Sequence, residues 1–124
     1  MASGNEETLT SLHKAKEHAI AMKAALLTDN LDDFGLLLGE AWESKKHFTA
    51  GITTPKIDVI YEKAKSAGAL GGKISGAGGG GFMFFFTKPD KRYAVTKALQ
   101  EEGIQIVNYS FTEIGLHTWE VRCP

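Results

Sequence analysis

A run of glycines followed at once by aromatic residues, near the middle of the 124-residue chain, constrains the fold most strongly. Glycine occupies position 76 and positions 78–81, and residues 82–86 are all apolar. Glycine tolerates positive φ and close approach to the backbone, but it costs conformational entropy. A short, bulky apolar run that ends before Pro89 is typical of a buried strand. The pattern predicts a loop between two strands with uncovered peptide N–H groups, an arrangement that suits an anion or a neighbouring loop packed against it.

Two nucleotide-binding motifs share this glycine content, and the neighbouring residues exclude both. Gly76, Gly78 and Gly81 satisfy G-x-G-x-x-G, but the dinucleotide motif requires a helix directly after the turn. Here a strand is expected instead. A P-loop is excluded because Ala67 stands where its first glycine belongs and Ile74 where its Ser or Thr belongs.

Composition limits the classes of protein to which the chain can belong. The net charge of −1, with dispersed basic residues, argues against nucleic-acid binding. The single cysteine, Cys123, cannot form an internal disulfide, and it fits a reducing cytoplasm. The polar first ten residues and the lack of a long apolar run predict no signal peptide and no membrane partner. We expect a cytoplasmic protein with a flexible start over residues 1–8 and one domain over residues 9–124.

Apolar periodicity and turn residues predict eight elements. Helices are expected over about 6–28, from 30 or 31 to 47, and from Pro55 to the residues before Gly68. Strands are expected over 72–75 and 82–87, then a helix from Pro89 to Gly103, then strands over 104–111 and 116–122. These elements favour an α+β fold, a four-stranded antiparallel sheet with packed helices in a ferredoxin-like arrangement.

Several positions within these elements carry more detailed predictions. Gly35 and Gly39 each cost about 1 kcal/mol inside a helix, so they indicate close packing against another element. Both faces of the 82–87 strand are apolar, so both should be covered. The apolar phase shifts between Ile106 and Val107, which favours a bulge. Alternation over 116–122 predicts that Trp119 and Val121 point inward.

The stretch 72–83 resembles the third motif of the GHMP small-molecule kinases. The flanking residues are similar to the carboxy-terminal region of bacterial D-glycero-D-manno-heptose 7-phosphate kinases. The sugar-1-kinase end of fucokinases is the second most similar. These flanking residues lie at 42–46, 51–55, 57–58, 61 and 68–71. The likeness covers residues 9–121. It implies a kinase-family carboxy-terminal domain, a four-stranded antiparallel sheet backed by helices, with the glycine loop at the active-site cleft.

The resemblance also implies what lies outside this chain. The nucleotide loop, the catalytic aspartate and the magnesium-ligating carboxylate of such kinases belong to an amino-terminal domain, which nothing in residues 1–70 resembles. ATP, Mg²⁺ and a sugar phosphate would therefore act in the complete enzyme, with none bound tightly by this chain. We expect no catalytic residue here, no activity from the chain alone, and pairing with an amino-terminal kinase domain or self-association.

Candidate binding residues fall into two groups, each with a simpler alternative. The loop residues expected to border the nucleotide phosphates are Gly76, Ala77, Gly78, Gly79, Gly80 and Gly81. Their alternative role is a tight strand connection, although a two-residue hairpin needs at most two glycines. The residues considered for the substrate are Lys73, Ser75, Lys45, Lys46 and Thr53.

Each substrate candidate has a structural alternative. Lys73 either places a charge near a phosphate or points to solvent. Ser75 fits hydrogen bonding within the loop. Lys45 and Lys46 suit the negative end of a helix dipole, and Thr53 suits a helix cap. The residues His13, His18 and His117 have no ligand partners at metal-site spacing, so no metal site is expected.

Three functions follow. The leading one is the carboxy-terminal domain of an ATP-dependent kinase that phosphorylates the anomeric hydroxyl of a heptose 7-phosphate. The alternative is a non-catalytic binding or assembly domain that dimerises or pairs with a separate kinase chain. The third is a ferredoxin-like small-ligand sensor whose glycine loop binds an anion.

Overall fold

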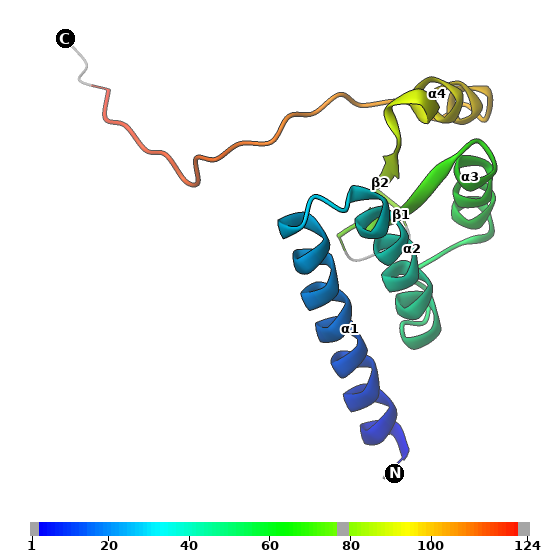
Figure 1. Ribbon diagram of the computed structural model, residues 1–124, viewed down its shortest axis with the longest axis vertical. Helices are drawn as coiled ribbons and strands as arrows, with labels where there is room; N and C mark the ends of the chain where they lie inside the picture. The colour runs from blue at the N-terminus through cyan, green and yellow to red at the C-terminus, as the bar shows by residue number, and fades with distance from the viewer. Residues whose placement is uncertain (1–2, 77–79, 122–124) are drawn as a thin grey trace.

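The structure is a computed structural model that describes residues 3–76 and 80–121. Figure 1 shows two long helices side by side, a small sheet against the second helix, and two shorter helices beside the sheet. In chain order the elements are α1 (Ser3–Leu27), α2 (Leu31–Phe48), α3 (Pro55–Ser66), β1 (Ala69–Ser75), β2 (Phe82–Thr87), the 3₁₀ helix η1 (Pro89–Lys91) and α4 (Arg92–Glu101).

The helix boundaries follow the capping residues of the sequence. The Asn30 side chain accepts a hydrogen bond from the Asp33 N–H at 3.3 Å, which caps α2. Thr54 does the same for α3, accepting from the Ile57 N–H at 3.3 Å, and proline follows as the first helical residue. Gly68 ends α3 with φ of 115°. These predicted boundaries are confirmed.

The sheet is an antiparallel pair in which Gly71 lies opposite Phe86, Lys73 opposite Phe84 and Ser75 opposite Phe82. The glycine loop therefore joins two neighbouring antiparallel strands, as the sequence predicted. A register shift between Ala69 and Gly71 marks a bulge at the start of β1.

Helix α2 packs directly on the backbone of β1. A Cβ added to Gly71 would lie 2.1 Å from the Gly35 carbonyl oxygen and 2.6 Å from the Gly39 nitrogen. Real Cβ atoms do not approach backbone this closely, so only glycine fits. The close packing predicted for Gly35 and Gly39 is confirmed, with Gly71 as its partner across the contact.

The core lies mainly on the other face of the sheet, under α3. One cluster of buried residues comprises Trp42, Ile52, Ile57, Tyr61 and Ile74, and a second comprises Ile60, Ala64, Ala69, Val95 and Leu99. The face of α3 that packs on these clusters consists of Ile57, Ile60, Tyr61 and Ala64, which are all buried. Met83 and Phe85 of β2 pack against both clusters.

Helix α1 begins at Ser3 and lies along α2. Its apolar residues Leu9, Leu12 and Ile20 are each more than half exposed. The α1 residues that line the groove beside α2 are Ser11, Leu12, Ala15, His18 and Met22.

The prediction of four strands is wrong for the part of the chain that the structure describes, where the sheet has two strands. Residues 104–121 form no strand, and Figure 1 shows them running away from the helices. Alternating apolar residues show only that a segment is able to pair with a neighbouring strand. Pairing also requires backbone hydrogen bonds to a sheet edge. Residues 104–109 line the groove beside β2, with the Tyr109 and Phe84 ring centres 5.5 Å apart, but they form no ladder with it.

Two finer expectations fail with those strands. No ladder forms at Ile106 and Val107, so the expected bulge has nothing to interrupt. Trp119 and Val121 are about three-quarters exposed rather than inward. The free side of β2 instead borders an open groove of 1250 Å³ between α3, α4 and residues 104–109.

Candidate functional site

The described part of the glycine loop is exposed and needs glycine for its backbone conformation. Gly76 has φ of 94° and Gly81 has φ of 96°, values that side chains rarely adopt. A Cβ added to Gly76 or Gly80 would meet no heavy atom within 4 Å. Ala77, Gly78 and Gly79 lie outside the described residues. A Cβ added to Gly81 would meet only the Ser75 carbonyl oxygen, at 3.8 Å.

Two of the five substrate candidates meet in one groove. Lys45, in the last turn of α2, and Lys73, on the exposed face of β1, both line a groove of 380 Å³ that α1 closes from the other side. This volume lies in the range of about 300–1,000 Å³ that is usual for small-molecule sites. Neither lysine has an ion-pair partner among the described residues.

The same groove contains buried polar nitrogens that the sequence did not single out together. Trp42 is 1 % exposed, and its indole Nε1 has no hydrogen-bond partner within the described chain. His18 Nδ1 is likewise buried and unpartnered, while His18 Nε2 lies 4.0 Å from Glu40 Oε2. His18 was considered only as a metal ligand. The packing of α1 against α2 brings His18 beside Trp42. The spacing of apolar residues in the sequence does not predict this packing.

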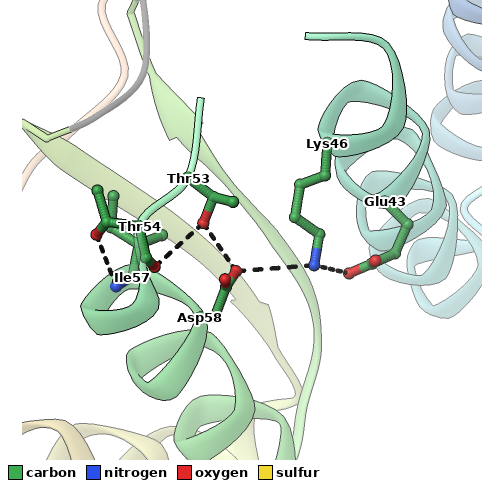
Figure 2. A network of polar contacts seen from close by, with 6 residues as sticks. All are labelled: Glu43, Lys46, Thr53, Thr54, Ile57 and Asp58. Atoms are coloured by element: carbon green, nitrogen blue, oxygen red, sulfur yellow. Dashed lines mark hydrogen bonds and ion pairs between the residues drawn. The ribbon is translucent and has the colours of Figure 1, made fainter. Parts of the chain in front are cut away.

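Lys46 and Thr53 enter a different cluster, which joins α2 to α3. Figure 2 shows the Lys46 Nζ between two carboxylates, 2.8 Å from Glu43 Oε1 and 3.9 Å from Asp58 Oδ1. The Thr53 hydroxyl donates to Asp58 Oδ1 at 2.7 Å. Both residues therefore have structural partners. The Lys46 ammonium and the Thr53 hydroxyl both contact Asp58, and these contacts hold the end of α2 against the start of α3.

Tyr61 lies under this cluster. Lys46 Nζ sits 5.6 Å from the centre of its ring. Burial raises the pKa of the Tyr61 hydroxyl above its ordinary value of 10.0, and the nearby Glu43 charge raises it further, while a backbone hydrogen bond at Gly72 opposes the shift. The folded state holds this proton more tightly than the unfolded state. The resulting stabilisation is complete below the unfolded pKa and is lost as pH rises through the folded value.

Ser75 ends β1 as an exposed residue opposite Phe82, one position before the loop. Over residues 3–76 and 80–121, no group of three or more His, Cys, Asp and Glu side chains gathers where a metal ion could be held. The described helices include none long and apolar enough to cross a membrane.

The fold and the loop define a class of protein. The family model described as GHMP kinases C terminal matches residues 22–105, and the chain belongs to this family. The match spans α2, α3, both strands and α4, so it includes the groove lysines and the glycine loop.

The chain is also similar to individual kinases. The chain is 40% identical over 118 residues to the D-glycero-alpha-D-manno-heptose 7-phosphate kinase of Campylobacter jejuni, a match that covers 95% of this chain and 35% of the relative. It is 34% identical over 96 residues to the L-fucokinase/L-fucose-1-P guanylyltransferase of Bacteroides fragilis, which covers 77% of this chain and 10% of that protein.

A solved structure agrees with these sequence matches. A crystal structure from Campylobacter jejuni, described as that of a candidate sugar kinase, superposes with a TM-score of 0.54 at 42% identity, over 75% of this chain and 28% of that one. The chain thus spans about a third or less of the length of these relatives. The similarity to sugar kinases that the sequence suggested is confirmed.

Proposed function

We propose that this chain is the carboxy-terminal domain of an ATP-dependent kinase that phosphorylates the anomeric hydroxyl of a heptose 7-phosphate. The observation that carries the proposal is the 40% identity to a heptose 7-phosphate kinase across 95% of the chain. In this proposal residues 9–124 form the domain, and an amino-terminal domain completes the enzyme.

The glycine loop has the properties that a phosphate-bordering role requires. Phosphoryl transfer depends mainly on positioning and on stabilising negative charge, for which fixed backbone N–H donors are suited. Gly76, Gly80 and Gly81 are exposed and carry no side chain that would obstruct a neighbouring surface. In the complete enzyme the loop would therefore line the cleft between the two domains.

This chain would contribute binding and shape, while the reacting groups would come from the other domain. ATP would supply the phosphoryl group and Mg²⁺ would neutralise triphosphate charge there. We expect the isolated chain to be inactive.

A chimaera tests this proposal. The carboxy-terminal third of the Campylobacter jejuni relative is replaced by this chain, and ADP release is measured with ATP and heptose 7-phosphate. We expect turnover by the chimaera and none by the chain alone. The variant Gly76→Val, strained at φ of 94°, should lower turnover, because side chains avoid this conformation. A folded chimaera that binds ATP but does not release ADP would contradict the proposal.

A non-catalytic assembly domain is the second candidate, and one observation favours it. Large apolar side chains of residues 104–121 are exposed, including Phe111, Leu116 and Trp119. Exposed apolar surface of this kind promotes association. An assembly domain would bind a separate kinase chain without supporting turnover when fused to the relative's amino-terminal region.

A further inference from the structure

The groove between α1, α2 and β1 has the composition of an anion site. Four of its lining side chains carry nitrogen: His18, Trp42, Lys45 and Lys73. None of the described residues that line it is Asp or Glu. Lysine and tryptophan can only donate hydrogen bonds, and histidine can donate from either nitrogen. The matching ligand group is therefore one that offers several acceptor oxygens and negative charge.

Two unpartnered nitrogens supply a second, independent argument. A buried donor without an acceptor costs about 1–3 kcal/mol, so each such group needs an acceptor that the described residues do not supply. Trp42 Nε1 and His18 Nδ1 are both buried without a partner in the described chain, and both residues belong to the groove wall. Neither nitrogen has appreciable accessible surface, so an oxyanion in the groove would serve as their acceptor once the Trp42 and His18 side chains turn towards it.

Binding an anion in this groove requires more than one lysine, because negative charge nearby opposes it. Lys45 is in the last turn of α2, where the helix dipole places partial negative charge. The Glu40 carboxylate lies 4.0 Å from His18 Nε2. Both effects oppose an anion. The unpaired charges of Lys45 and Lys73, which converge from different elements, offset them.

The position of the groove relative to the glycine loop indicates which anion fits. Lys73 lies on β1 three positions before Gly76, the first loop residue, a separation of at most about 10 Å. This is of the order of the distance from the anomeric hydroxyl to the phosphate in a seven-carbon sugar phosphate. A substrate with its hydroxyl at the loop would thus carry its phosphate towards the two lysines.

We infer that this groove binds the phosphoryl group of the sugar phosphate substrate, through Lys45 and Lys73 with Trp42 and His18 in its wall. The inference rests on the proposed function for the identity of the ligand, but its anion-binding chemistry rests on the groove alone. It assigns Lys46 and Thr53 no contact with the ligand, since their partners lie in the α2–α3 junction.

Binding to the chain itself is the first test. The indole N–H signals of Trp42 and Trp119 are followed by NMR, with Trp119→Phe for assignment, while heptose 7-phosphate, the unphosphorylated heptose, inorganic phosphate and ADP are titrated. We expect the two non-nucleotide phosphates to move the Trp42 signal and the unphosphorylated heptose to leave it unchanged. Tighter binding of ADP than of heptose 7-phosphate in the groove would overturn the inference.

Lysine variants make the test specific. Lys45→Gln and Lys73→Gln should each weaken heptose 7-phosphate binding about tenfold, the loss expected for one charge-assisted hydrogen bond. Lys97→Gln, an exposed lysine of α4, is the matched control and should bind normally. Both groove lysines are exposed, so these variants should fold as the unchanged chain does. Equal affinities across all three variants would overturn the inference.

The chimaera separates this inference from the proposed function. If it is active, Lys45→Gln and Lys73→Gln should raise KM for the sugar phosphate with KM for ATP unchanged. An active chimaera that is indifferent to both changes would refute the groove assignment and leave the kinase proposal standing. An inactive chimaera whose isolated domain still binds phosphate through these lysines would refute the kinase proposal and support the anion site.

Discussion

At the scale of single residues, Gly71 has the most demanding environment in the sheet. The space for its side chain is filled by backbone atoms of α2, at 2.1 Å and 2.6 Å. Backbone cannot move aside as the end of a flexible side chain can. This position therefore requires glycine for reasons of space, while Gly76 and Gly81 require it for backbone conformation.

We expect Gly71→Ala to destabilise the domain by about 3 kcal/mol, because the added methyl group forces α2 away from β1. Gly115→Ala, where a Cβ would meet nothing within 4 Å, is the control and should change stability by less than about 0.5 kcal/mol. Urea unfolding followed by circular dichroism measures both. Similar midpoints for the two variants would show that the α2–β1 contact is looser than described.

At the scale of elements, the junction of α2 and α3 depends on a polar cluster rather than on apolar packing alone. Lys46 bridges Glu43 of its own helix and Asp58 of the next, and Thr53 donates to the same Asp58 oxygen. The Lys46 side chain is 21% exposed, so its charge is partly shielded from solvent. An ion pair in this setting contributes more than one at the open surface.

A double-mutant cycle should detect this difference. Lys46→Met and Asp58→Asn are expected to show a coupling energy of about 0.5–1 kcal/mol in urea unfolding. The matched control is Lys91→Met with Asp90→Asn, an exposed pair at the same 3.9 Å separation, for which about 0.3 kcal/mol or less is expected. Equal coupling in the two cycles would refute a special role for the α2–α3 junction.

The sequence predicted elements whose signals are local. Thr54, Pro55 and Gly68 bound α3 because capping and left-handed backbone depend on neighbouring residues only. The strands 104–111 and 116–122 were wrongly predicted because strand formation needs a distant partner edge, which alternation does not specify.

The same distinction applies to the candidate site. Lys45 and Lys73 were each identified singly from the sequence, but their convergence depends on how α2 crosses β1. His18 and Trp42 could be joined to them only once α1 was known to lie along α2. The local signals for Lys46 and Thr53, a helix end and a cap, favoured structural roles, and their partners in the structure are structural.

At the scale of the whole molecule, the extended segment is the most unusual part. Phe111 is 91% exposed and Leu116 is 95% exposed, and α1 also presents leucines to solvent. Small proteins rarely leave so many large apolar side chains uncovered. In the proposed enzyme, the amino-terminal domain would reduce this exposure.

We expect the isolated chain to self-associate as its concentration rises, because association buries the exposed segment. The triple variant Phe111→Ser, Leu116→Ser, Trp119→Ser should shift the sedimentation profile towards monomer. A control with three polar positions of the same segment changed, Asn108→Ser, Thr112→Ser and Thr118→Ser, should associate like the unchanged chain. Monomers at all concentrations for the unchanged chain would contradict this expectation.

The direct meeting of α2 and β1 has a consequence for the range of ligands that the neighbouring groove can accept. Lys45 follows Gly39 by six positions on the helix, and Lys73 follows Gly71 by two on the strand. No side chain separates α2 from β1 at these glycines. Side-chain repacking therefore cannot change the distance between the helix and the strand there. A change of ligand preference in this groove would therefore come from the residues that project into it or from the position of α1, since the glycines fix how closely α2 and β1 approach.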